Sequence, residues 1–214
     1  MYVNNPTLDY LPETVLNLIP KHKKGNSRDT ISFITVDSGV ALSNFTLIKQ
    51  RLLNVNNWSE FCTKTPVKFE IHDSSGNFRD RYVKLNDSVK IQISIPSISN
   101  RISDLVTDWV VVNRVEEKDN EDTSLFLIQL VPVDCPENNK EEVKHFYENC
   151  ASNTFILFRN KEIISLSIHG RNESLNLKTN SKLKLIRNFL VANLGYLGID
   201  NLLWFDFANK ILKS

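Results

Sequence analysis

Alternation of apolar and polar residues in the middle of the chain constrains the fold more than any other sequence feature. From Val89 to Ile95 every second residue is Val or Ile, and the residues between them are polar. The same period of two occurs over Val67–Ile71 and Ile164–Ile168. This period is typical of β-strands with one buried face. Because short turns separate several of the β-like segments, we expect an antiparallel sheet.

The period lengthens towards both ends of the chain. Over Leu183–Leu197 apolar residues recur at spacings of three and four, which predicts a long amphipathic helix. An earlier helix is predicted after Ser43 and Asn44, either of which can cap its first turn. A further helical turn is expected around Trp58, and a short helix at 141–149. These helices and the sheet together define an α+β protein.

Three segments resemble the START and polyketide cyclase superfamily (SRPBCC), which includes the Bet v 1-like proteins. Leu52–Trp58 is similar to a Leu-x-(Asp/Asn)-x-x-x-Trp stretch that is frequent in the superfamily. The strand predicted at 67–70 is followed by a turn at Gly76, and the long terminal helix starts near Ser181. The resemblance covers about residues 30–197.

The resemblance implies the helix-grip fold, in which a curved antiparallel sheet wraps around a long C-terminal helix and two short helices follow the first strand. Residues 30–197 would form this domain, with a helical insertion near 141–149. Residues 1–29 would form an N-terminal arm with a short helix, and 198–214 a C-terminal amphipathic extension. In this fold an apolar cavity between sheet and helix can hold a lipid, sterol or polyketide.

Strand alternation selects the residues expected to face that cavity. A slip of one position would invert any of these assignments. An alternative is that the same side chains fill the interior at native packing density and leave no space. The amide of Asn193 could orient a ligand or cap the helix end. The candidate ligand-binding residues are Phe69, Ile91, Trp109, Leu127 and Ile164 from strands, and Phe189 and Asn193 from the helix.

The sequence predicts no catalytic residue, metal site or cofactor. His72 and His169 fall at positions expected to point away from the helix. Glu141, His145 and Glu148 share a helix face, but zinc needs more ligands than these supply. Motifs for serine hydrolases, phosphate loops and dinucleotide binding are absent from the sequence.

Two polar side chains, Gln129 and Asn193, are expected to point inward, and neither is a good acid or base, which counts against catalysis. Binding without catalysis is therefore the leading hypothesis, and a cyclase or hydratase-type enzyme that uses the same cavity is the alternative. A third hypothesis is a ligand-free interaction module in which 141–149 and the C-terminal segment contact a partner, including a second copy of the chain.

Charge and cysteine usage limit the partners and the location. The chain has 26 Lys and Arg against 25 Asp and Glu, which argues against general attraction to nucleic acid. No apolar run reaches the length of about 18 residues expected of a membrane span. Cys62, Cys135 and Cys150 form no disulfide or metal pattern. With a polar N-terminal segment unlike a signal peptide, these features predict a cytoplasmic protein. Binding of a hydrophobic small molecule or lipid is what the resemblance to the superfamily implies.

Overall fold

The core of the protein is one seven-stranded antiparallel sheet. The computed structural model describes residues 11–64, 66–95, 104–134, 150–174 and 198–213. Neighbouring strands follow the order β1-β7-β6-β5-β4-β3-β2, and every neighbouring pair is antiparallel. The strands are β1 (Asn26–Thr35), β2 (Val67–His72), β3 (Ser88–Ile95), β4 (Asp104–Asp119), β5 (Thr123–Pro132), β6 (Ser152–Asn160) and β7 (Ile163–Glu173).

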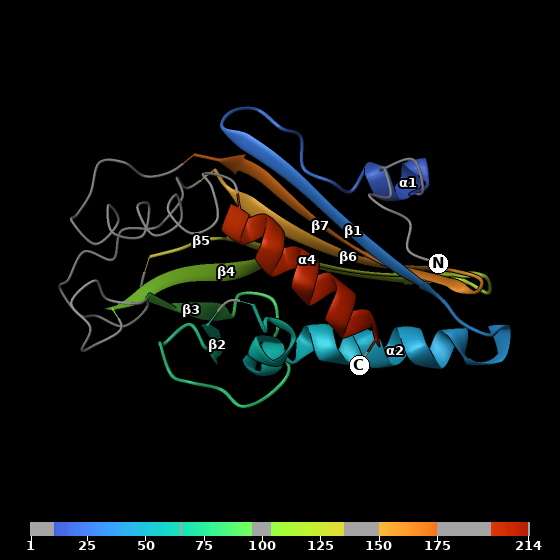
Figure 1. The fold of residues 1–214 in the computed structure, drawn as a ribbon, viewed down its shortest axis with the longest axis horizontal. Coiled ribbons are helices and arrows are strands. Elements are labelled where there is room, and N and C mark those ends of the chain that lie inside the picture. Colours follow the sequence, from blue (N-terminus) through green and yellow to red (C-terminus); the bar gives the residue numbers. More distant parts are fainter. Residues whose placement is uncertain (1–10, 65, 96–103, 135–149, 175–197, 214) are drawn as a thin grey trace.

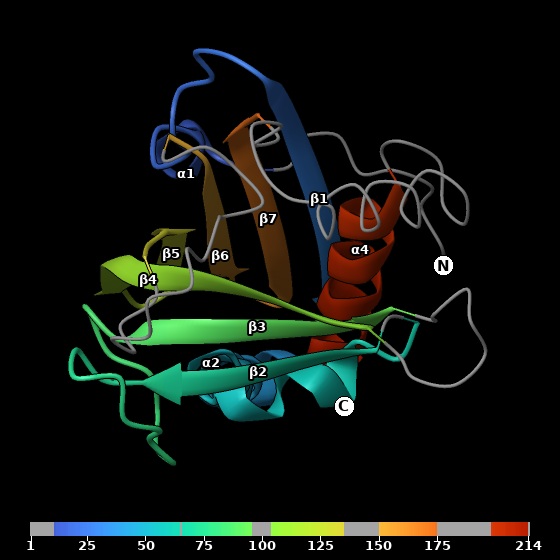
Figure 2. The same cartoon turned by 90° about the vertical axis from the view of Figure 1, so that its left-hand side faces the viewer.

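The sheet is strongly curved. Figure 2 shows β2, β3 and β4 running across the view, whereas β6, β7 and β1 run steeply up it. A β-bulge contributes to this change because the register of β4 against β5 shifts between Val112 and Arg114. A bulge inserts one residue into one strand and increases its local twist.

Helical segments pack on one face of the sheet, which we call the inner face. They are η2 (Ser38–Val40), α2 (Ala41–Leu53), η3 (Val55–Phe61) and α4 (Gly198–Lys213). Among them, α2 packs against β5, β6 and β7, η3 packs against β2, and α4 packs against β1 and β7. Figure 1 shows α4 crossing this face of the curved sheet, with α2 beside it. The α+β helix-grip prediction is confirmed by this architecture.

The centre of the inner core is Trp58. Its ring is fully buried, and its centroid lies 5.1 Å from those of both Phe155 and Phe207. Its indole Nε1 donates a hydrogen bond of 3.1 Å to the carbonyl of Leu52 at the end of α2. The Trp predicted from the sequence to follow a helix therefore joins that helix, the sheet and α4.

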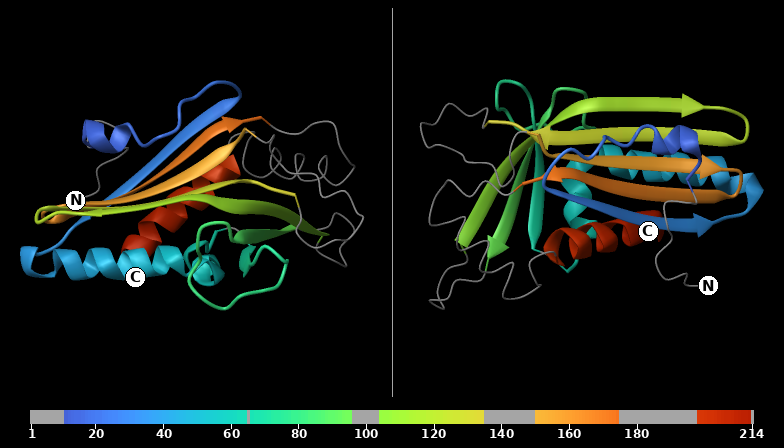
Figure 3. Two further views of the ribbon diagram at one scale, coloured as in Figure 1. Left: turned by 180° about the vertical axis from the view of Figure 1, so that it is seen from behind. Right: turned by 90° about the horizontal axis from the view of Figure 1, so that it is seen from above.

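The N-terminal arm covers part of the opposite face, which we call the outer face. Here α1 (Glu13–Leu16) packs on the sheet, and Figure 3 shows it on the side away from α2. Arg114 of β4 donates a hydrogen bond of 3.1 Å to the carbonyl of Leu18. The buried apolar residues of this outer cluster are Leu11, Val15, Ile31, Leu125, Leu127 and Ile156.

Strand β2 lies at the edge of the sheet, and the connection to β3 covers part of its free backbone. Asn56 Oδ1 accepts a 2.8 Å hydrogen bond from the Ile71 amide, and Asn56 Nδ2 donates to the Arg79 carbonyl at 2.9 Å. The Arg79 amide in turn donates to the Ile71 carbonyl. Pairing of exposed edge groups protects a sheet from association with other strands.

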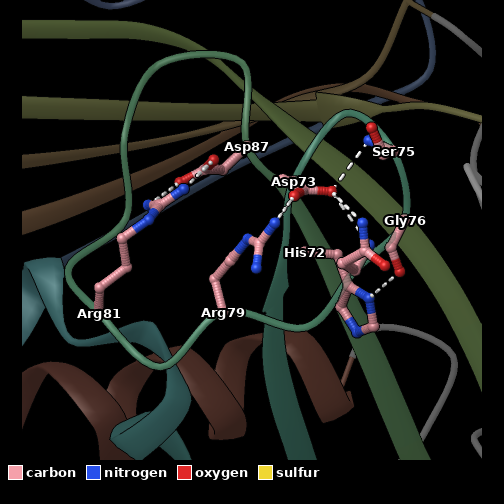
Figure 4. Close-up of polar contacts among 8 residues, drawn as sticks. His72, Asp73, Ser75, Gly76, Arg79, Arg81 and Asp87 are labelled. Carbon is pink, nitrogen blue, oxygen red and sulfur yellow. Dashed lines mark hydrogen bonds and ion pairs between the residues drawn. The ribbon is translucent and has the colours of Figure 1, made fainter.

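Two ion pairs order the connection between β2 and β3, as Figure 4 shows. Asp73 bonds to Arg79 and accepts hydrogen bonds from the backbone amides of Ser75 and Asn77. Arg81 holds Asp87 through two hydrogen bonds of 2.6 and 2.9 Å. The connection is therefore a fixed structure that contacts the junction of α2 and η3.

Helix α4 falls in the segment 198–214, for which the sequence predicts a C-terminal amphipathic extension. Its apolar side packs in the inner core through Trp204, Phe207 and Ile211. The helix predicted at 181–197 and the insertion predicted at 141–149 lie outside the described residues.

Candidate functional site

The inner face of β2, β3 and the first part of β4 is the candidate site. Antiparallel register fixes which residues share this face, because directly paired residues point to the same side. Phe69 pairs with Ile91, and Ile91 pairs with Asp108. Val67 with Ile93, and Val89 with Val110, lie on the same face.

Burial differs along the inner face. Under the helices, Phe155 and Leu157 of β6 and Ile128 of β5 are completely buried. Ile91, Ile93 and Val110 are only half-buried, although they pack against the same core. Three aliphatic side chains are thus left partly uncovered on β3 and β4, next to the region that α2, η3 and α4 fill.

Phe69 lies at the boundary between these two regions. It is 1% exposed, and its ring centroid lies 5.5 Å from Trp58 and 6.5 Å from Trp204. One side of Phe69 therefore completes the aromatic core. Its neighbour across the strand pair is the half-buried Ile91.

Asp108 is an ionisable group on this face that the sequence analysis missed. It is 5% exposed and lies directly opposite Ile91. Its Oδ1 accepts a 2.9 Å hydrogen bond from the Trp109 amide, and this is not its sole contact. On β4 it precedes Val110 and Val112 at a spacing of two, so it interrupts an apolar row. In the sequence this interruption can be recognised only if it is already known which residues of β4 face inward.

The structure brings only part of the predicted ligand-binding set together. Phe69 and Ile91 are neighbours on the inner face, and Ile164 is on the same face but far from them along the sheet, paired with Ile34 and Arg159. A ligand role for these three stays a prediction. Phe189 and Asn193 lie outside the described residues.

The assignment of Trp109 to the inner face is wrong. Trp109 pairs with Lys90, and Lys90 pairs with Glu70, which places all three on the outer face. The His72 ring lies edge-on to Trp109 with centroids 4.9 Å apart, and Lys90 Nζ lies 5.3 Å from the ring centroid. Trp109 is thus buried on the outer face, where its ring makes a cation–π contact.

The assignment of Leu127 to the inner face is also wrong. Leu127 is fully buried in the outer cluster with Val15 of the N-terminal arm. Ile156 and Phe158 of β6 pack in the same place. Gln129, expected to point inward, is on the outer face as well and donates to Thr154 Oγ1 at 2.8 Å.

A polar network is buried on the outer face between β1 and β7. His169 Nδ1 lies 2.6 Å from Asp29 Oδ1, and His169 Nε2 lies 2.9 Å from Ser167 Oγ. Arg171 also donates to Asp29 Oδ1, at 2.7 Å. Both His72 and His169 are on the outer face as expected, but both are buried rather than at the surface.

Burial and hydrogen bonding oppose each other in setting the pKa values of His169 and Asp29. Burial lowers the pKa of His169, although the hydrogen bond to Asp29 opposes that change. Burial would raise the pKa of Asp29, but hydrogen bonds from His169 and Arg171 outweigh it and lower the pKa. The order Ser, His, Asp is that of a hydrolase triad. Ser167 is fully buried, however, so the network links β1 to β7 and presents no accessible nucleophile.

The described residues offer little other chemistry. Burial, together with the Asp206 carboxylate, raises the pKa of Cys62 to about 12, so this thiol remains protonated at neutral pH. Within the described ranges, no three His, Cys, Asp or Glu side chains gather in a metal-binding arrangement. None of the helices in this part of the chain has the length and apolar character needed to cross a membrane.

Comparisons with known proteins give no sequence match and several distant structural neighbours. No family model matches the sequence, and no curated protein matches it. Ginseng major latex-like protein 151 from Panax ginseng is 16% identical with a TM-score of 0.32, over 78% of this chain and 92% of that one. A hypothetical protein from Helicobacter pylori is 8% identical with a TM-score of 0.40, over 96% and 97%.

The order of elements and strands in the structure is that of a helix-grip fold, with the curved antiparallel sheet packed against α2 and α4.

Proposed function

We propose that the protein binds a hydrophobic small molecule or lipid on the inner face of β3 and β4. The observation that carries this proposal is the incomplete burial of Ile91, Ile93 and Val110 beside a core that is otherwise closely packed. A ligand lying against them would remove apolar surface from water, worth about 25 cal/mol per Å².

The position of the helices supports this location. The described helices pack chiefly on β1, β2 and β5 to β7. On the inner face of β3 and β4 a ligand would make the apolar contacts that these helices make elsewhere on the sheet. Ligand sites are commonly apolar concave surfaces with a few polar groups. The Asp108 carboxylate on this face fits that composition.

Enzyme activity of the cyclase or hydratase type has less support. General acid and base chemistry on one substrate normally requires more than one titratable group at the site. On the inner face within residues 67–72, 88–94 and 107–112, Asp108 is the one ionisable side chain. Cytoplasmic location and pairing with a second copy of the chain stay predictions of the sequence.

The test is binding of diphenylhexatriene, an uncharged apolar probe that fluoresces when removed from water. We expect saturable binding by the full-length protein, and an apolar molecule that co-purifies in native mass spectrometry. Ile91→Trp should weaken probe binding about tenfold, because overpacking costs about 1–3 kcal/mol.

The matched control is Ile163→Trp, at the exposed first residue of β7. It should bind the probe as the unmodified protein does. Absence of saturable binding and of any co-purifying molecule would reject the proposed function. Equal weakening by both substitutions would reject the proposed location.

A further inference from the structure

The loop between α1 and β1 carries a basic surface that has no part in the core or in the proposed site. Lys21, His22, Lys23 and Lys24 are consecutive in this loop, and all four are exposed. From residue 14 to residue 28 the chain contains no Asp or Glu. In a chain with a net charge of +1, residues 21–24 are thus a local concentration of positive charge, which we call the basic loop.

Hydrogen bonds fix the basic loop to the sheet on both sides. The backbone amides of Lys23 and Lys24 both donate to Asn172 Oδ1 near the end of β7, at 2.7 and 3.3 Å. Before the loop, the carbonyl of Leu18 accepts a hydrogen bond from Arg114 of β4. Because the backbone is held at these two points, the charges of the loop are presented at a constant place on the surface.

Acidic side chains at the adjoining ends of β1 and β7 are engaged with other residues. Glu173 is 3% exposed, and its carboxylate lies 3.0 Å from Arg28 Nε. The carboxylate of Asp29 contacts both His169 and Arg171. These negative charges are balanced by cations of the two strands, so they do not cancel the charge of the basic loop.

Strand direction places the basic loop at the same end of the sheet as part of the proposed site. The loop leads into β1, whose first residue Asn26 pairs with Glu173 at the end of β7. Because every neighbouring pair is antiparallel, β4 begins and β3 ends at this same end. Ile93 is two residues before the end of β3. A surface that meets the loop would therefore lie at the end of the sheet where Ile93 is found.

We propose that the basic loop docks the protein on a membrane surface that contains anionic phospholipid. The choice of a membrane as partner rests on the proposed function, because membranes are where lipids and other hydrophobic molecules accumulate. Leu18 and Ile19, half-buried and just before the loop, would add apolar contacts at the lipid interface. Residues 14–28 contain no Phe, Tyr or Trp on which bases could stack, which disfavours nucleic acid as the partner.

The experiment is cosedimentation of the full-length protein with phosphatidylcholine vesicles that contain either no phosphatidylserine or about 30% of it. We expect binding to the vesicles with phosphatidylserine at about 50 mM NaCl, and loss of this binding at about 500 mM NaCl, because salt screens the attraction. Vesicles of phosphatidylcholine alone should bind much more weakly. Equal binding to both kinds of vesicle, or binding to neither, would overturn the proposal.

The double substitution Lys21→Gln with Lys23→Gln tests the location. It should lower the affinity for the anionic vesicles about 25-fold, since each lysine close to such a surface contributes about fivefold. The matched control is Lys118→Gln with Lys161→Gln, which removes the same charge from exposed positions at the opposite end of the strands. The control should bind the vesicles as the unmodified protein does, and equal losses in both would overturn the proposed location.

Binding of diphenylhexatriene without vesicles separates this proposal from the proposed function. The Lys21→Gln, Lys23→Gln protein should bind the probe normally, which also establishes that it is folded. If the unmodified protein binds the probe but no anionic vesicles, the docking surface is rejected and the proposed function stands. If it binds anionic vesicles through the basic loop but no probe, the proposed function fails and the docking surface stands. Binding to a DNA duplex rather than to vesicles would also reject the membrane as partner.

Discussion

The two halves of the sheet differ in how completely their faces are covered. In β5, β6 and β7 the inner face is buried under α2 and α4, and much of the outer face is buried under the N-terminal arm. In β3 and the first part of β4, aliphatic side chains on the inner face are half-buried, and the outer face carries mostly polar residues such as Lys90 and Gln92.

This difference in burial indicates which side chains contribute mainly to stability and which can contact a ligand. Side chains covered on every side contribute to stability through burial and close packing, and little can be added beside them. Side chains that are partly uncovered contribute less to stability and remain able to contact a ligand. We therefore call β5 to β7 with β1 the closed half, and β3 with the first part of β4 the open half.

Trp58→Ala should give the largest effect, because it removes the ring at the centre of the closed half. Trp58 is fully buried, and its neighbours include Phe155, Phe207 and Trp204. We expect a loss of about 3–5 kcal/mol in the free energy of unfolding, measured by urea denaturation. Phe205→Ala, on an exposed position of α4, should change it by about 0.5 kcal/mol or less. Similar losses in both variants would contradict the core position of Trp58.

Leu127→Ala tests whether the outer cluster belongs to the closed half. Leu127 is fully buried against the arm, so its truncation should cost about 2–4 kcal/mol of unfolding free energy. Because it points away from the inner face, probe affinity of the folded protein should not change. A variant with normal stability and weakened probe binding would show that the outer face, rather than the inner one, contains the ligand site.

The same difference explains which residues could be placed from the sequence. In β2 and β3 polar residues occupy one face, so the alternation assigned Phe69 and Ile91 to the inner face correctly. In β5 the segment from Leu125 to Leu130 is apolar at all positions but Gln129. A strand buried on both faces has no alternation to read. Leu127 could not be assigned without knowledge that an arm covers the outer face.

The assignment of Trp109 failed for a second reason, which is the bulge in β4. The inserted residue reverses the phase between Val112 and Arg114, so Val115 faces inward although it is an odd number of residues from Val112. A uniform alternation through Val115 places Trp109 inward and Asp108 outward, which is the opposite of the structure. The size and apolar character of Trp109 also favour an inward position. In the structure its ring lies on the outer face, where it makes a cation–π contact with Lys90.

The outer network between β1 and β7 makes the closed half sensitive to pH. Burial keeps the pKa of His169 below its usual value of 6.5, whereas the unfolded chain protonates this group near that value. The contribution is therefore complete above pH 6.5 and is lost as pH falls through the lowered pKa. Asp29, whose pKa is also lowered, adds a second loss below pH 3.8.

Urea unfolding at pH 7.5 and pH 5.5 measures the first of these losses. Between pH 7.5 and pH 5.5 the free energy of unfolding should decrease less in His169→Gln than in the unmodified protein. The two decreases should differ by up to about 1.4 kcal/mol for each pH unit below 6.5. Comparison of slopes, rather than of absolute stabilities, separates this effect from the packing change that the substitution itself causes. Equal slopes would contradict a buried neutral His169.

Ile91→Ala in the open half is expected to cost less stability than truncation of a buried side chain in the closed half. Ile91 is half-buried, so its truncation should cost about 1 kcal/mol or less, whereas Ile128→Ala, at a fully buried position of the closed half, should cost about 2–5 kcal/mol. Affinity for diphenylhexatriene should follow the reverse order. Ile91→Ala should weaken it about fivefold by removal of about 1 kcal/mol of apolar contact, and Ile128→Ala should leave it unchanged. If both substitutions cost the same stability, the inner face is equally closed along its length, and β3 and β4 have no special capacity to bind a ligand.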